Sequence, residues 1–191
     1  RAVGAEAQRR RKGERVLAPS CCRAPAAGME VTSNSERAVR SQKMVVELLA
    51  SDVPERVYKL DSELDTWKRK LGIGAPRFPA REQPAADLSH PAMAVNLDAC
   101  IQCTRCVRAC REAQVNDVIG YAHRGAHSAI VFDLDDPMGE SSCVACGECV
   151  QACPTGALAP AHDAYLAPVD RRVSSVCPYC GVGCQLTYHV K

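Results

Sequence analysis

Two groups of four cysteines, each spaced C-x2-C-x2-C-x3-C, constrain the fold of this 191-residue chain more than any other feature. The groups are Cys100, Cys103, Cys106 and Cys110, and then Cys143, Cys146, Cys149 and Cys153. Every position of the first group recurs in the second at a constant offset, and Pro154 follows the last cysteine. This is a spacing with which thiolates hold pairs of [4Fe-4S] clusters. The sequence therefore predicts a fold built partly around inorganic cores.

The spacing also predicts which cysteines share a cluster. Thiolates at i, i+3 and i+6 can occupy three iron corners of one cubane, and in bacterial ferredoxins the fourth cysteine of each run ligates the other cluster. We therefore assign the ligands of the first [4Fe-4S] cluster to Cys100, Cys103, Cys106 and Cys153. Those of the second cluster are Cys143, Cys146, Cys149 and Cys110. Arg111 stands where the second group has Pro154, so we expect the helix after the first group to continue through Val115.

Two other cysteine chemistries fit the pattern less well. Zinc sites usually take paired C-x2-C arms separated by a spacer. Disulfide frameworks belong to secreted chains, and no apolar segment follows the basic residues 9–12 as a secretion signal would require. Thirteen cysteines without such a signal predict metal ligation in a reducing cytoplasm. No run approaches 18 apolar residues, so we expect no transmembrane helix and no membrane partner.

Charge and composition narrow the interpretation further. The net charge is +2, but residues 1–23 carry seven Arg or Lys and two Glu. We interpret this basic stretch as a disordered end, and expect no nucleic-acid partner. The chain has few aromatic residues with which to build a hydrophobic core, namely one Trp, five Tyr and two Phe. Cluster binding should therefore supply part of the folding free energy.

Four segments are expected along the chain. Residues 1–30 are a disordered end, residues 31–92 a helical and Pro-rich linker, residues 93–168 the two-cluster domain, and residues 169–191 a further cysteine-containing segment. Between the cysteine groups, residues 118–122 and 129–134 alternate as strands of a β-hairpin that turns through Gly125. The predicted fold class is therefore α+β.

The linker carries recognisable helix boundaries. Ser33 and Glu36 form a capping box that predicts a first helix. A second helical piece is expected to begin at residues 52–55. It is recapped by Asp61 or Ser62 and ends at Gly72.

Charged residues near the first cysteine group predict an order of reduction. Arg105, Arg108 and Arg111 lie in or beside it, whereas Glu148 takes the position of Arg105 in the second group. Positive charge near a cluster favours its reduced, more negative state. We expect the first cluster to be the easier one to reduce.

A third cysteine motif follows with a different spacing, C-x2-C-x3-C, at Cys177, Cys180 and Cys184. Apolar residues at 173–176 and 186–190 predict strands on either side. Three thiolates leave one iron corner of a third [4Fe-4S] cluster open. Either that cluster is site-differentiated or its fourth ligand lies beyond Lys191.

These motifs resemble a known family. CPYCGVGC at residues 177–184 is similar to the start of the catalytic domain of molybdenum- or tungsten-dependent formate dehydrogenases. Preceded by HPAMAVNLDACIQCTRCVRAC and CVACGECVQACPTGAL, it resembles the alpha subunit of cytoplasmic, NAD-dependent formate dehydrogenases. The resemblance covers roughly residues 20–191. The last segment would then be the first strands of a truncated molybdopterin oxidoreductase domain, which makes the chain a fragment.

The resemblance implies more cofactors than this chain can hold. Cys22 would be the last ligand of a [2Fe-2S] site whose other three cysteines are absent, so residues 1–30 would include the remnant of a [2Fe-2S] domain besides the disordered end. A bis-pterin molybdenum or tungsten centre would oxidise formate, with its ligands outside this chain. Electrons would then pass through the clusters to flavin and iron–sulfur subunits that reduce NAD. No residue of this oxidoreductase segment is expected to be catalytic.

Two alternatives stay open. The large subunits of NADH:quinone oxidoreductases and nitrate reductases share these modules. A protein of a different class, a free-standing polyferredoxin, would carry electrons without a catalytic domain. Such a carrier would be expected to complete the third motif with a nearby fourth cysteine, and none follows Cys184.

Overall fold

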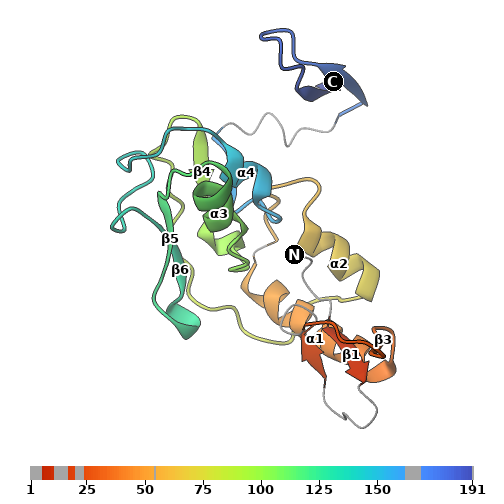
Figure 1. Cartoon of the computed structure of the whole chain (residues 1–191). Helices are drawn as coiled ribbons and strands as arrows, with labels where there is room; N and C mark the ends of the chain where they lie inside the picture. The colour runs from red at the N-terminus through yellow and green to blue at the C-terminus, as the bar shows by residue number, and fades with distance from the viewer. Residues whose placement is uncertain (1–5, 11–16, 20–23, 54, 162–168, 191) are drawn as a thin grey trace.

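The computed structural model describes residues 6–10, 17–19, 24–53, 55–161 and 169–190 (Figure 1). Residues 93–160 form an α+β arrangement in which two short antiparallel sheets pack with the helical segments 105–108, 109–113 and 148–152. Strands β4 (Met93–Val95) and β7 (Leu158–Pro160) pair at the two ends of this region. Strands β5 (Ile119–Ala122) and β6 (Ala129–Phe132) form the second sheet. The 3-10 turn η2 (Leu97–Ala99) leads into the first cysteine group.

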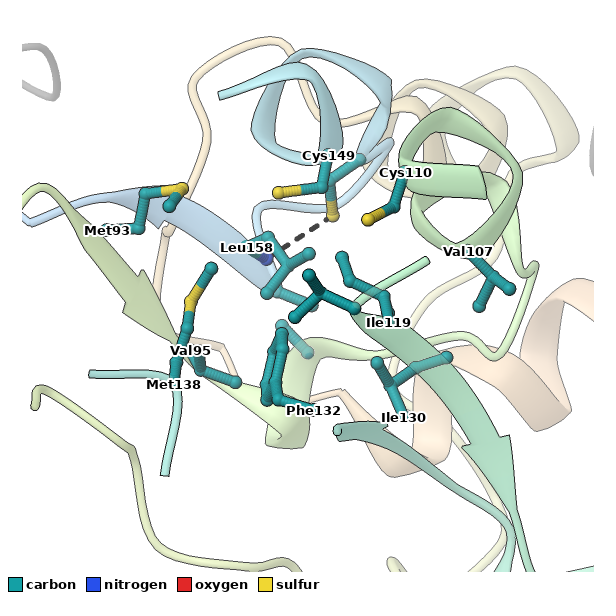
Figure 2. Close-up of a cluster of buried hydrophobic side chains, with 14 of the residues drawn as sticks. Met93, Val95, Val107, Cys110, Ile119, Ile130, Phe132, Met138, Cys149 and Leu158 are labelled. Atoms are coloured by element: carbon teal, nitrogen blue, oxygen red, sulfur yellow. Dashed lines mark hydrogen bonds between the residues drawn. The ribbon is translucent and has the colours of Figure 1, made fainter. Parts of the chain in front are cut away.

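The predicted β-hairpin between the cysteine groups is confirmed. Ile119 pairs with Phe132 and Ala122 with Ala129, and the turn η4 (Gly125–His127) joins the strands. The side chains of Ile119, Ile130 and Phe132 are buried in the core. Figure 2 shows these three side chains beneath Cys110 and Cys149. The hairpin therefore supplies apolar support for the cysteines.

The helix after the first cysteine group ends earlier than predicted. Helix α3 (Arg105–Arg108) passes into a π-helical turn, η3 (Ala109–Ala113). The N–H of Gln114 donates to the carbonyl of Ala109 at 3.1 Å. Val115 then takes a left-handed φ of 58°, which helical backbone cannot include, so the helix does not continue through it. The second group has the shorter helix α4 (Glu148–Ala152).

The two linker helices begin and end at capping residues. Helix α1 (Glu36–Asp52) is capped by Ser35, whose Oγ accepts from the N–H of Ala38 at 3.2 Å, so the predicted cap at Ser33 is two residues early. Helix α2 (Glu63–Leu71) is capped by Ser62 and ends at Gly72 with a φ of 65°, as predicted. The expected helical piece from residues 52–55 is absent from the described residues 55–61, which instead pack against the central domain.

The N-terminal part differs from the disordered end expected over residues 1–30. Strand β1 (Glu6–Arg10) pairs with β2 (Ala18–Pro19) on one side and β3 (Glu30–Thr32) on the other. These pairings join residues far apart in sequence, which local composition does not reveal.

The C-terminal strands are confirmed. Strands β8 (Arg171–Val176) and β9 (Gln185–Val190) pair antiparallel, with Val176 opposite Gln185, and carry the third cysteine motif in their loop. No helix in the described part of the chain is long and apolar enough to span a membrane.

Candidate iron–sulfur centres

Cysteines from both motifs line a cavity that we call the first cavity. Its cysteines are Cys100, Cys103, Cys106 and Cys153. Apolar side chains, among them Ile101, Ile130 and Leu158, complete the wall. Cys153 is buried and the other three cysteines are half-buried. Four sulfurs thus face one largely apolar space.

A second cavity holds the complementary set. Its cysteines are Cys110, Cys143, Cys146 and Cys149. Phe132 and Met138 contribute apolar wall. Cys110 and Cys149 are buried, whereas Cys146 is exposed (Figure 2 shows the two buried ones). The second cavity therefore has one cysteine exposed to solvent, whereas the first has none.

The grouping of cysteines is the one that the crossed-ligand pattern predicts. Cys110 reaches the second cavity from the π-helical turn η3, and Cys153 reaches the first from the C-terminal end of α4. A π-helical turn changes the direction of the side chains that follow it, and such turns are frequent at functional sites. The structure brings the eight cysteines together in two fours; ligation of clusters by them remains a proposal.

The two cysteine loops share an unusual backbone. Gln102 and Thr104 have φ near 55° in the first loop, and Ala145 and Gly147 take left-handed φ values at the equivalent positions of the second. Non-glycine residues pay about 1 to 2 kcal/mol for this conformation. It directs the N–H of Gln102 to Cys100 Sγ and that of Ala145 to Cys143 Sγ, each at 3.4 Å. Hydrogen bonds to ligand sulfurs are a feature of iron–sulfur sites.

Burial disfavours the deprotonated form of several cysteines that line the two cavities. It raises the pKa of Cys100 to about 11 and that of Cys149 to about 12. The pKa of Cys106 rises further for the same reason. Such thiols stay protonated near neutral pH unless a metal displaces the proton, because metal binding and deprotonation are coupled.

The donor set fits a cluster better than a single ion. Among the residues that the structure describes, no three His, Cys, Asp or Glu side chains lie close enough to hold one metal ion. A zinc site would need its sulfurs about 2.3 Å from a common point. The cysteines line the walls of two cavities instead, as ligands at the corners of an iron–sulfur cube would.

The third motif is less enclosed. The N–H of Cys177 donates to the carbonyl of Cys184 at 2.8 Å and closes the loop between β8 and β9. Cys177 is half-buried, and Cys180 and Cys184 are exposed. Within residues 169–190 the motif offers three sulfurs, as predicted. Cys22 lies outside the described residues.

The structure adds a contact that the sequence analysis missed. Residues 55–65, which we call the cover segment, contact residues in and beside the wall of the first cavity without lining it, although they were assigned to the linker. Lys59 Nζ donates to the carbonyl of Cys153 at 2.8 Å, and the N–H of Glu63 donates to that of Pro154 at 2.9 Å. The carboxylate of Glu63 accepts both Arg105 Nη1 at 2.5 Å and Nη2 at 2.9 Å.

A close backbone approach fixes the cover segment. Gly156 has a φ of 85°, and a Cβ on it would lie 2.8 Å from the backbone of Tyr58. Tyr58 is buried, and its hydroxyl donates to Asp98 Oδ2 at 2.7 Å. Gly156 is the one sequence signal that could have indicated this approach, because glycine often marks places where another backbone comes near.

The pairing of Arg105 changes the electrostatic argument from the sequence. The hydrogen bond from Arg105 holds the pKa of Glu63 below its ordinary value, so the two charges offset each other. Arg111 is likewise paired, with Asp117 at 2.7 Å. The order of reduction stays a prediction, but Arg105 gives it little support.

Comparison with known families defines the class of the chain. Residues 90–159 match the family described as "NADH-quinone oxidoreductase subunit 3, ferredoxin-like domain", and residues 170–191 match the "Molybdopterin oxidoreductase Fe4S4 domain". A solved structure, that of an NAD+-reducing [NiFe]-hydrogenase in the H2-reduced state, aligns with a TM-score of 0.73 and 25% identity. The alignment covers 80% of this chain and 68% of that one. The chain thus carries a mixed helix and strand, ferredoxin-like domain with cysteines suited to [4Fe-4S] clusters.

Individual relatives place it more closely. A subunit of an NADH-quinone oxidoreductase of Rhizobium meliloti is 33% identical over 92% of this chain and 21% of its own length. The NADP-reducing hydrogenase subunit HndD of Solidesulfovibrio fructosivorans is 32% identical over 77% of this chain and 26% of its own length. A putative formate dehydrogenase of Staphylococcus haemolyticus is 26% identical over 70% of this chain and 17% of its own length. The chain spans about a quarter or less of these curated relatives, and it is an iron–sulfur segment of the type found in such oxidoreductase subunits.

Proposed function

We propose that this chain relays single electrons through two [4Fe-4S] clusters, one in each cavity. The observation that carries the proposal is the crossed lining, in which each cavity takes three cysteines from one motif and one from the other. Crossed ligands tie the two clusters into one domain and hold them close enough for electrons to pass between them. The chain's own residues bind and orient the clusters, exclude water from them and adjust their potentials.

The third motif extends the relay toward a catalytic centre. Cys177, Cys180 and Cys184 would hold most of a third [4Fe-4S] cluster at the start of a molybdopterin domain, which the match at residues 170–191 supports. In the complete protein, electrons from a molybdenum or tungsten pterin centre would reach this cluster first. They would leave through the two cavities, and through a [2Fe-2S] cluster near Cys22, toward flavin and iron–sulfur subunits that handle NAD in the cytoplasm.

Formate is the substrate that we propose for that centre. The segment CPYCGVGC supports it, as does the presence of putative formate dehydrogenases among the relatives. A second candidate is the electron-transfer subunit of an NADH-quinone oxidoreductase, which the higher identity to the Rhizobium meliloti protein over most of this chain favours.

Anaerobic reconstitution tests the relay. The purified chain, supplied with iron and sulfide, should bind about eight irons and eight sulfides in the two cavities, with any third cluster adding to them. Reduction should produce electron paramagnetic resonance signals of two interacting clusters. A folded protein that binds zinc without sulfide would contradict the proposal.

The substrate is tested in the complete native protein. Formate should reduce the clusters without NADH if the first candidate holds. Reduction by NADH, with none by formate, would support the second candidate, and reduction by neither would contradict both.

A further inference from the structure

The cover segment brings charged groups to the backbone of two residues that line the first cavity. Lys59 and Glu63 contact the carbonyls of Cys153 and Pro154, which belong to the last part of the second cysteine motif. No residue of the cover segment lines either cavity, but both carbonyls belong to residues that line the first cavity and neither belongs to a residue that lines the second. The two cavities, alike in cysteines and loop backbone, therefore differ in the charges placed beside them.

The two charges of the cover segment are not equivalent. Glu63 is engaged by both Nη atoms of Arg105, so its carboxylate offsets a guanidinium that also lies close to Cys103 and Cys153. Lys59 takes part in none of the ion pairs found among the described residues. Its ammonium bonds instead to an uncharged carbonyl at 2.8 Å, on the residue that supplies the buried sulfur.

We propose that Lys59 and Glu63 tune the potential of the first cluster in opposite directions. The inference rests on the proposed function, because it requires a cluster in the first cavity. A [4Fe-4S] cluster with four thiolates changes its total charge from −2 to −3 when it accepts one electron, with no bond made or broken. The electron comes from the neighbouring cluster in the protein, or from dithionite in a titration.

The direction of each effect follows from this charge change. The Lys59 ammonium stabilises the extra negative charge and makes the first cluster easier to reduce. The Glu63 carboxylate opposes it by cancelling Arg105. Both groups act at short range from a half-buried site, where screening by solvent is weaker than at the surface.

Redox titration of the reconstituted full chain tests the proposal. The first cluster is identified as the one whose signal changes in Cys103→Ser. In Lys59→Met, we expect the ratio of its reduced to oxidised form at a fixed potential to fall about tenfold, which is 59 mV for one electron. In Glu63→Gln, which keeps a hydrogen-bonding amide beside Arg105, the ratio should rise by a similar factor.

Three further variants separate tuning from structural damage. Lys43→Met is the matched control, because Lys43 is exposed on α1 and lines neither cavity. In Lys43→Met, the ratio of reduced to oxidised form of each cluster at a fixed potential should stay within about twofold of the wild-type value. Lys59→Arg should restore the wild-type value, and the double variant Lys59→Met with Glu63→Gln should fall between the two single variants.

The outcomes are distinct. Opposite shifts confined to the first cluster support the proposal. Two clusters that form normally, with potentials that do not move or that move in the same direction in both variants, overturn it and leave the relay intact. A wild-type chain that binds no iron and sulfide overturns the relay and this inference together. If Lys59→Met does not fold, the sign of the Glu63→Gln shift alone decides.

Discussion

The two cavities share their ligands and their loop backbone but not their surroundings. Each has four cysteines, left-handed residues at equivalent positions and an N–H directed at its first sulfur. Beside the first, Lys59 and Glu63 from outside the repeat bond to the carbonyls of Cys153 and Pro154, whereas at the second Cys146 is exposed and Val144 is 64% exposed. The repeat therefore encodes how a cluster is held, and the unrepeated cover segment encodes how the first site differs from the second.

Removal of one crossed cysteine should have the largest effect. In Cys153→Ser, we expect loss or conversion of the first cluster although the residue belongs to the second motif, so that bound iron falls from about eight toward about four. Cys110→Ser should do the same to the second cluster. Iron and sulfide analysis, with electron paramagnetic resonance of each variant, measures this. Loss of the second cluster in Cys153→Ser would show that the ligands are not crossed.

The crossed lining of the cavities could be predicted from the sequence because it follows from the spacing of the cysteines, while ligation of clusters by these cysteines stays a prediction. Local sequence signals also predicted several elements that the fold keeps. These are the hairpin, the cap at Ser62, the helix end at Gly72 and the strands around the third motif.

The differences between the cavities could not be predicted in the same way. The contacts of Lys59 and Tyr58 join residues that are far apart in the chain, and neither residue stands in a recognisable motif. Arg105 looked like a free charge beside a cluster because its partner, Glu63, lies outside the repeat. The end of the helix at η3 was also missed, because no residue type requires a π-helical turn. Spacing predicts which cysteines line each cavity, while the environment of each cavity depends on tertiary contacts.

Substitution of Gly156, which lies against the backbone of the cover segment, should produce the next largest effect. In Gly156→Ala, the new Cβ meets the Tyr58 backbone at 2.8 Å and the residue keeps an unfavourable φ of 85°. We expect a loss of about 3 kcal/mol in the free energy of unfolding. Gly72→Ala is the matched control, because its φ is also positive but nothing lies within 4 Å. It should cost about 1 kcal/mol. Equal losses in anaerobic denaturant unfolding would mean that the cover segment does not pack as described.

Tyr58→Phe should have a smaller and pH-dependent effect. Burial, together with the hydrogen bond to Asp98, raises the pKa of Tyr58 from 10.0 to about 12. Because the folded state holds this proton more tightly than the unfolded state, the wild type should lose stability as pH rises from about 10 to about 12. At neutral pH the variant should lose about 1.5 kcal/mol, the hydrogen bond to a carboxylate.

The pH comparison gives that variant its own control. Between pH 10 and 12 the gap between wild type and Tyr58→Phe should narrow, since the variant has no phenol to ionise at this site. The free energy of unfolding measured at pH 7, 10 and 12 tests this. A gap that stays constant would contradict the burial of the hydroxyl against Asp98.

The smallest effect is expected at the second cavity, where the neighbouring ion pair lies in solvent. Arg111 and Asp117 are 59% and 64% exposed and 2.7 Å apart. Exposed pairs contribute little because solvent and salt screen them. Asn tolerates the left-handed φ of 56° at position 117, so Asp117→Asn removes the charge without straining the backbone. We expect a change below about 0.5 kcal/mol in the free energy of unfolding, and less still in high salt. A loss as large as that of Tyr58→Phe would show that the second cavity also depends on contacts outside its cysteines, and the contrast between the two sites would then narrow to Lys59 and Glu63.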